Sequence, residues 1–240
     1  MRKEPFATGD YLHVYNRGNR KQEIVRDAND RWRFLQLLYY FNTKKTPENP
    51  FRDLRDSLKS DFNSRLVWPD TWAPQEPIVA IVAFALMENH FHLLLKEVAD
   101  GGLTLFMRRL GTGMTNRFNV KYNESGRLFQ GAYKAKRIDA DFYLEQVSVY
   151  IQVKNPFELY PNGGLEKALA EFDKAYEWAA EYPYCSLGDY AKNRNSPLIA
   201  KDADVLGEVL PSRGAYKKLA REYLLNTTAD KTLKTLLFNS

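Results

Sequence analysis

The stretch 78–97, IVAIVAFALMENHFHLLLKE, constrains the fold more than any other part of the chain. It consists of two apolar runs typical of β-strands, separated by a short polar break. The second run carries His90 and His92 on either side of Phe91. Side chains alternate between the two faces of a strand, so both imidazoles share one face and Phe91 packs on the other. The sequence therefore predicts a buried hairpin that presents a pair of histidines.

A pair of imidazoles in an otherwise apolar strand requires a partner. The chain has three histidines, and two of them are used at this spacing. A bound metal ion explains such a pair. Hydrogen bonds within the core account for such pairs more often than a metal ion does, so the His-x-His spacing alone does not predict a metal site.

Composition limits the class of protein. The chain has 240 residues, of which 44% are hydrophobic, and it is rich in tyrosine and phenylalanine. These values predict one large domain with an aromatic core. The single cysteine, Cys185, excludes an internal disulfide and a cysteine-based zinc site. No apolar run has the length of a membrane span, and the first residues lack the apolar core of a secretory signal. We expect a soluble, cytoplasmic protein without a membrane partner.

Positive charge is concentrated in one window. The whole chain carries a formal net charge of +5, whereas residues 103–137 contain eight basic residues and one acid, Glu124. A basic zone interleaved with aromatic residues indicates a polyanionic partner, although a solvated basic face gives the same pattern. The basic residues of the window are Arg108, Arg109, Arg117, Lys121, Arg127, Lys134, Lys136 and Arg137.

The order of predicted elements indicates a fold class. We expect a strand at 10–16, a helix at 29–42, two strands within 78–97, a helix at 103–122, a strand or strand pair at 126–138, and a helix at 139–155. This is an α+β fold, a ferredoxin-like split βαβ antiparallel sheet with helices on one face. In that topology the first and third strands are neighbours. His13 then lies beside the histidine strand, as a supporting or core residue.

Two segments stand apart from this sheet. Residues 43–76 are rich in proline and are predicted to form a surface insertion. Residues 161–240 are predicted to form a C-terminal helical tail, with helices at 165–182, 203–210 and 215–225. We therefore divide the chain into a domain of residues 1–160, which includes the insertion, and a tail of residues 161–240.

Three segments, in order, resemble a known family. They are MENHFHLLLKE, GRLFQGAYKAKRID and YLEQVSVYIQVKNP, and Tyr15-Asn16-Arg17-Gly18 matches the family's opening strand and turn. Together they resemble the single-tyrosine HUH transposases, the enzymes of the smallest bacterial insertion sequences and their REP-associated relatives. The likeness covers about residues 10–160, and YPYCSLGDY resembles a tail segment of the REP-associated branch.

The resemblance implies an activity and a site. It implies a bacterial or archaeal DNA transposase that cleaves and rejoins single-stranded, hairpin-associated DNA through a 5′-phosphotyrosine. Tyr150 would be the nucleophile, with Tyr143 as the other candidate. His90 and His92 would hold Mg²⁺ or Mn²⁺ together with a side-chain amide. Arg17 and the basic window would contact DNA, and a homodimer is an expectation for this family.

One position departs from the family pattern. Relatives carry the amide four residues after the tyrosine, where this chain has Lys154. Either the helix widens by one residue, as a π-bulge does, and Asn155 becomes the third metal ligand, or the ligand is Gln152 or Gln146. The lysine also favours an alternative, a catalytically inactive, transposase-derived DNA-binding protein.

The aromatic residues of the basic window have two interpretations. Phe118, Phe129 and Tyr133 could stack on unpaired bases, as in proteins that hold single strands. Packing in the core explains them equally well.

Overall fold

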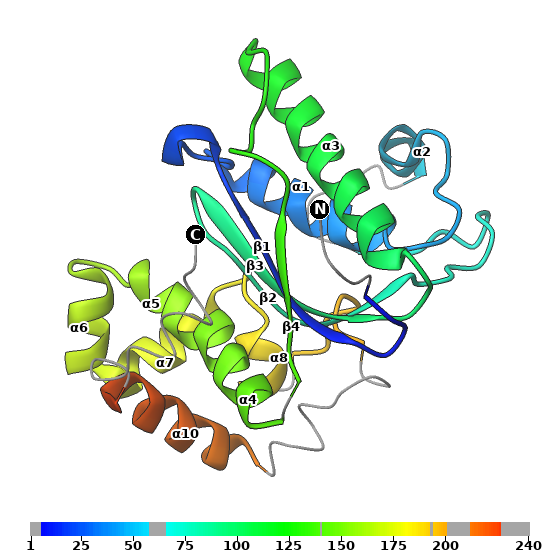
Figure 1. Ribbon diagram of the computed structural model, residues 1–240. Coiled ribbons are helices and arrows are strands. Elements are labelled where there is room, and N and C mark those ends of the chain that lie inside the picture. The colour runs from blue at the N-terminus through cyan, green and yellow to red at the C-terminus, as the bar shows by residue number, and fades with distance from the viewer. Residues whose placement is uncertain (1–5, 58–65, 140, 193, 201–211, 227–240) are drawn as a thin grey trace.

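The computed structural model of the chain describes residues 6–57, 66–139, 141–192, 194–200 and 212–226 (Figure 1). The sheet has four strands: β1 (Tyr11–Arg17), β2 (Val79–Leu86), β3 (His90–Glu97) and β4 (Lys134–Arg137). The helices before the tyrosine segment are η1 (Asn19–Lys21), α1 (Ala28–Tyr40), α2 (Pro50–Ser57), α3 (Gly102–Tyr122) and α4 (Asp141–Val149). Those that follow are the π-helix η2 (Tyr150–Lys154), α5 (Asn155–Glu158), α6 (Gly164–Ala170), α7 (Phe172–Glu181), α8 (Leu187–Ala191) and α10 (Arg213–Asn226).

The sheet confirms the predicted split βαβ topology. Its strand order is β2-β3-β1-β4, and every pairing is antiparallel. The first and third strands are central neighbours, as expected. Their register places Tyr15 opposite His92 and Arg17 opposite His90. Both histidines of β3 therefore lie at the centre of the sheet, at the end where β1 finishes.

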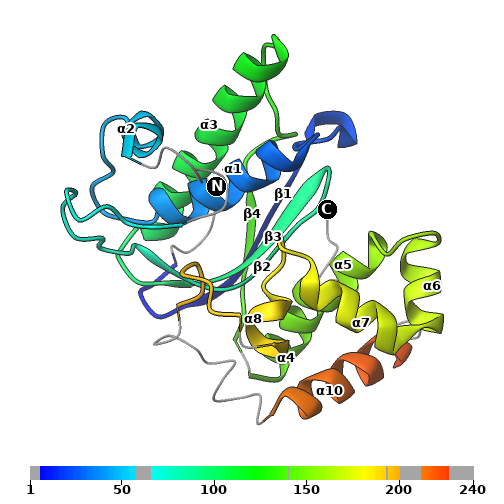
Figure 2. The same ribbon diagram turned by 180° about the vertical axis from the view of Figure 1, so that it is seen from behind.

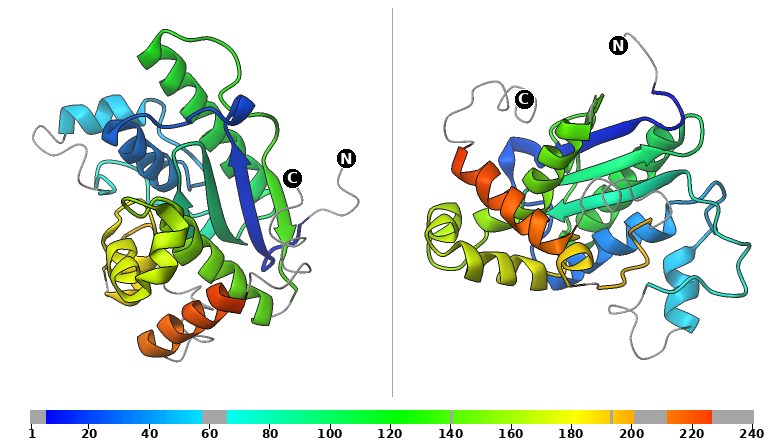
Figure 3. Two further views of the ribbon diagram at one scale, coloured as in Figure 1. Left: turned by 90° about the vertical axis from the view of Figure 1, so that its left-hand side faces the viewer. Right: turned by 90° about the horizontal axis from the view of Figure 1, so that it is seen from below.

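The two crossover helices cover one face of the sheet, where α1 and α3 lie side by side (Figure 1, Figure 3). Leu12 and Val14 of β1 and Phe91 of β3 belong to the buried cluster beneath them. The alternation of strand side chains thus assigns Phe91 to this face, as predicted, and leaves His90 and His92 for the other.

The opposite face is covered by the helices that follow β4. Leu94 of β3 packs in a second buried cluster with the π-helix segment, α7 and α10. The ferredoxin-like core therefore has its crossover helices on one face, as predicted, while the tyrosine segment and the tail bury the other face.

The tail also continues the sheet at its β2 edge. The backbone N–H of Leu86 donates to the Tyr184 carbonyl, and that of Ser186 donates to the Phe84 carbonyl. Ala85 and Cys185 form an antiparallel bridge. Seen from behind, α8 lies beside β2 (Figure 2). These bonds satisfy backbone groups that an edge strand otherwise leaves exposed.

Some predicted elements differ from the observed ones. The predicted strand 126–138 is a four-residue strand, β4, preceded by a loop. The predicted helix 165–182 is interrupted at Glu171, where the backbone leaves helical geometry (φ −113°, ψ 41°). The predicted helix 203–210 lies outside the described residues, whereas α10 confirms the last one. The division of the chain at residue 160 stays a prediction.

Candidate active site

His90 and His92 lie together on the face of β3 turned toward the tyrosine segment. Their ring centroids are 5.2 Å apart and the rings are perpendicular. His92 is 5% exposed, and His90 is half-buried. The predicted geometry of the pair is therefore present at the centre of the sheet.

Each imidazole is oriented by a bond to its Nδ1 atom. His92 Nδ1 lies 2.8 Å from His13 Nε2, and His90 Nδ1 lies 2.6 Å from the Asn89 side-chain oxygen. An amide oxygen can only accept, so Nδ1 of His90 carries the proton. If Nδ1 of His92 likewise donates to His13, both Nε2 atoms present lone pairs. Bonds of this kind fix the tautomer of metal-binding histidines, and His13 takes the supporting position that we expected.

Burial keeps the three imidazoles neutral. It lowers the pKa of His13 to about 3, with the Lys136 charge acting in the same direction. Burial, followed by the Arg17 charge, lowers the pKa of His90 to about 4. Burial also holds the pKa of His92 well below its usual value. Neutral imidazole is the form that binds metal ions.

Tyr150 lies against this histidine pair. Its ring is 5.1 Å from that of His92, edge to face at 88°, and 5.9 Å from that of His13. The residue is 3% exposed, and burial raises the pKa of its hydroxyl. Tyr143, the other candidate, is 41% exposed on α4 and does not line the pocket that contains Tyr150.

A π-turn begins at the tyrosine. Residues Tyr150–Lys154 form a π-helix, and the Asn155 N–H donates to the Tyr150 carbonyl. The widening that we proposed for this helix is therefore present. π-turns of this type are frequently found at functional sites.

The widened helix buries the predicted amide ligand. Asn155 is fully buried, and neither of its side-chain polar atoms has a hydrogen-bond partner among the described residues. Gln152 is also fully buried, and its side-chain nitrogen and oxygen likewise have no hydrogen-bond partner among the described residues. Neither residue lines the pocket beside Tyr150, and neither does Gln146. A buried amide without a partner requires an explanation, and a role as a metal ligand is one.

The pocket beside Tyr150 has a volume of about 400 Å³. We call it the tyrosine pocket; its lining residues are Tyr15, Asn16, Arg17, Lys21, His90, His92, Gln130, Lys134, Tyr150, Lys154 and Glu158. Four of these carry positive charge and one carries negative charge. The Lys154 ammonium is ion-paired with the Glu158 carboxylate and lies 5.3 Å from the centre of the Tyr150 ring.

The tyrosine pocket contains residues that sequence reasoning missed. Tyr15 stacks on His92 at 5.4 Å, and Glu158 faces the same pocket. The spacing of Tyr150, Lys154 and Glu158 by four residues was a usable signal for the carboxylate. As placed, however, no three His, Cys, Asp or Glu side chains of the described residues form a metal-binding group.

The nine basic residues assigned to DNA do not form one surface. Arg17 and Lys134 line the tyrosine pocket, and Arg108 and Arg127 line a second cavity beside α3. Arg109 donates to the carbonyl oxygens of the loop after α1, and Lys121 pairs with Asp27 and Asp30. Arg137 pairs with Asp10, the Arg117 side chain is partly buried, and Lys136 lies on β4 near His13. The assignment of these residues to DNA stays a prediction.

A comparison with models of protein families identifies the class of this site. Residues 74–154 match the family model described as "Transposase IS200 like". The matched segment includes the histidine strand, the basic helix α3, and the tyrosine with its π-helix. This match confirms the resemblance to the single-tyrosine HUH transposases and places residues 74–154 in the IS200-like transposase family.

A search of solved structures found one that is similar to the chain. It is described as a REP-associated tyrosine transposase bound to a REP hairpin. The similarity has a TM-score of 0.43 and 11% sequence identity, over 83% of this chain and 89% of that chain. No curated protein matches the chain. No helix of the described residues is long and apolar enough to cross a membrane.

Proposed function

We propose that the chain is a metal-dependent DNA strand transferase that acts on single-stranded, hairpin-associated DNA. The observation that best supports this proposal is the contact of the buried Tyr150 ring with the His92 ring. His90 lines the same pocket as these two residues. A phenol, two neutral imidazoles and several cationic side chains suit the transfer of a phosphodiester. The family match over residues 74–154 supports the same activity.

In the proposed reaction the Tyr150 oxygen attacks the phosphorus of a DNA phosphodiester. The new bond joins the tyrosine oxygen to phosphorus, and the bond from phosphorus to the 3′ oxygen breaks. The phenol proton leaves the tyrosine, and the departing 3′ oxygen takes up a proton to become a hydroxyl. Another 3′-hydroxyl reverses these steps and rejoins the strand, so no nucleotide cofactor is needed.

Basic side chains position the phosphate in this scheme. Arg17 and Lys134 enter the tyrosine pocket from neighbouring strands, and Lys154 enters it from the π-helix. A cationic pocket of this kind holds a phosphate and favours the extra negative charge that develops in the transition state. Binding should weaken steeply with salt.

The residues present fit a divalent cation. The bond from His90 Nδ1 to Asn89 leaves the lone pair of His90 Nε2 for a metal ion, and Nε2 of His92 offers a second lone pair when its Nδ1 donates to His13. The Asn155 amide, which has no hydrogen-bond partner among the described residues, offers an oxygen. Magnesium and manganese prefer oxygen ligands, and neutral imidazole is a common ligand of metal ions. When bound, such an ion polarises the phosphate and stabilises charge in the transition state.

The test is covalent capture of DNA. Purified protein is mixed with labelled single-stranded DNA from the flanks of its own gene, with Mn²⁺ or EDTA, and resolved on a denaturing gel. We expect a Mn²⁺-dependent protein–DNA adduct that Tyr150→Phe abolishes and Tyr143→Phe retains. Loss of the adduct only in Tyr143→Phe would transfer the nucleophile to Tyr143.

A second candidate is a catalytically inactive DNA-binding protein derived from a transposase. The observation that favours it is Lys154, whose ion pair with Glu158 occupies the wall where relatives carry an amide. The same gel separates the two candidates. Retained hairpin binding without an adduct, with or without Mn²⁺, would support the inactive protein and contradict the enzyme.

A further inference from the structure

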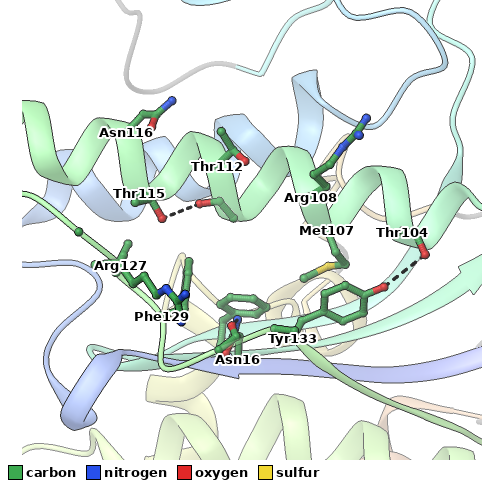
Figure 4. A pocket seen from close by; sticks show the side chains of 16 residues that line it. Asn16, Thr104, Met107, Arg108, Thr112, Thr115, Asn116, Arg127, Phe129 and Tyr133 are labelled. Carbon is green, nitrogen blue, oxygen red and sulfur yellow. Dashed lines mark hydrogen bonds between the residues drawn. The ribbon is translucent and has the colours of Figure 1, made fainter. Parts of the chain in front are cut away.

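A second cavity lies on the other side of the sheet from the tyrosine pocket, between α3 and the loop of residues 126–133 (Figure 4). We call it the α3 cavity; its volume is about 700 Å³. In Figure 4 the Met107 side chain descends from α3 toward the ring of Tyr133, and Phe129 stands on the opposite wall. A wide, aromatic-lined cavity of this size can accept a flat ring.

The walls of the cavity combine stacking surfaces with polar edges. Tyr133 is partly exposed, whereas Phe129 is 7% exposed and Met107 is 4% exposed. The Thr104 hydroxyl lies 3.5 Å from the Tyr133 hydroxyl, and Thr115 donates to the Gly111 carbonyl. These groups leave acceptor oxygens next to an apolar floor. Flat faces with polar edges are the chemistry of a nucleobase.

Two glycines of α3 differ in their surroundings, and one of them lines the open space of the cavity. A Cβ atom built on Gly113 would lie 2.7 Å from a Leu37 methyl, so packing against α1 explains that glycine. A Cβ atom built on Gly111, which lines the cavity, would meet nothing within 4 Å. A glycine inside a helix lowers stability relative to alanine. Among the described residues no contact accounts for Gly111, and a ligand that needs this space would account for it.

The charge of the α3 cavity suits a phosphate-bearing ligand. Arg108 and Arg127 are exposed lining residues, and the residues that line the cavity include no aspartate or glutamate. Among the described residues, neither guanidinium has a carboxylate partner within 4.0 Å. Arginine is well suited to bind phosphate through paired hydrogen bonds.

The α3 cavity is adjacent to the tyrosine pocket. Asn16 lines both, and its amide donates to the Gly131 carbonyl, which ties β1 to the loop. Gln130 and Lys134 line the tyrosine pocket, whereas Phe129 and Tyr133 line the α3 cavity. One short segment therefore forms a wall of both, and a nucleic-acid strand can pass from one to the other around Asn16.

We propose that the α3 cavity is a nucleobase site, which holds an unpaired base of the DNA strand near the phosphate bound in the tyrosine pocket. The base stacks on Tyr133 above the floor of Phe129 and Met107, and its phosphate lies against Arg127. This inference rests on the proposed function, because it takes the ligand to be the DNA substrate. It adds a site at which the protein itself contacts a base.

The test fills the cavity from Gly111. Gly111→Leu places a side chain in the open space and raises helix propensity, so the variant should fold. We expect it to weaken the binding of a single-stranded oligonucleotide, followed by fluorescence anisotropy, by roughly 5- to 150-fold, the range for one lost stacked base. Val120→Leu, at an 82% exposed position of the same helix, is the matched control and should bind like the original protein. Wild-type affinity in Gly111→Leu would overturn the proposal.

Abasic substitutions locate the base and separate this site from the chemistry. Each nucleotide of the oligonucleotide is replaced in turn by an abasic residue. One position should cause the same loss as Gly111→Leu, and the two changes together should cost no more than either alone. Additive losses at every position would contradict the site. A wild-type protein that binds but forms no adduct would contradict only the proposed reaction, because the anisotropy measurement needs no cleavage.

Discussion

The tyrosine pocket and the α3 cavity are separated by the width of one sheet, yet they are built differently. In the tyrosine pocket the imidazoles of His92 and His90 are oriented by hydrogen bonds to His13 and Asn89. In the α3 cavity the walls are aromatic, and the arginines stand at an open surface. Fixed polar groups suit chemistry at one phosphate, and open stacking surfaces suit recognition. Side chains alternate along β3, so its histidines line the tyrosine pocket on one face and Phe91 lines the α3 cavity on the other.

The largest expected effect comes from the histidine face of β3. His92→Asn should lower the rate of adduct formation roughly 1,000-fold, because a lost ligand removes several kcal/mol of transition-state stabilisation. Mn²⁺ binding, measured by isothermal titration calorimetry, should fall with it. Phe91→Leu, on the opposite face of the same strand, is the control and should retain Mn²⁺ binding. Equal losses in both variants would mean that the strand, and not the pocket, was damaged.

A smaller effect should identify the third ligand. Asn155→Ala should weaken Mn²⁺ binding about 10- to 100-fold if the orphaned amide completes the cation site. Glu158→Ala should change it less, because the Glu158 carboxylate is engaged by Lys154. The measurement is a Mn²⁺ titration followed by electron paramagnetic resonance. The reverse order of effects would assign the ligand to Glu158 and leave the Asn155 amide unexplained.

Two lysines test whether the basic residues with ion pairs inside the fold differ in role from those that line the tyrosine pocket. Lys121 contacts Asp27 and Asp30 at 2.5 and 2.7 Å, so Lys121→Met should cost about 2 kcal/mol of unfolding free energy and leave DNA affinity unchanged. Lys134→Met should weaken DNA binding and leave the free energy of unfolding unchanged, since that lysine lines the tyrosine pocket. Urea unfolding and fluorescence anisotropy measure the two quantities. A loss of DNA affinity in Lys121→Met would show that Lys121 contributes to DNA binding.

The Lys121 variant also has an expected pH dependence. Burial raises the pKa of Asp30, but hydrogen bonds from Lys121 and Tyr122 outweigh burial and hold it below its usual value of 3.8. A depressed carboxyl pKa stabilises the fold above the unfolded value, and this stabilisation is lost as pH falls through the folded one. The difference in stability between the original protein and Lys121→Met should therefore be full at pH 7 and shrink below about pH 4.

The smallest effect concerns the empty space at Gly111. Gly111→Ala should raise the free energy of unfolding by about 0.5–1 kcal/mol, because the helix gains propensity and the added methyl meets no neighbour. Gly113→Ala should destabilise the protein, since its methyl would press on Leu37. Urea unfolding compares the two variants. A loss of stability in Gly111→Ala would show that the glycine serves packing.

The sequence was most informative where patterns are local. Alternation placed His90 and His92 on one face, and the family resemblance left a π-bulge after Tyr150 as one of two alternatives. Long-range partners were out of reach. Arg109 and Lys121 are predicted to contact DNA, and no local pattern shows that they also bond to Thr43 and Asp30, which lie 66 and 91 residues away. The burial of Asn155 depends in the same way on how the π-helix packs against β2 and β3, which no local pattern specifies.

The bonds from the tail to β2 have a consequence for assembly. An unpaired edge strand is a template on which another chain can add a strand. Here Tyr184 and Ser186 already occupy that template, so a second copy can extend the sheet along β2 only after displacing them. The other edge, β4, is four residues long and carries Lys134, Lys136 and Arg137, whose charges repel a like strand. Addition of a strand from a second copy would therefore have to displace the tail at β2 or bring like charges together at β4.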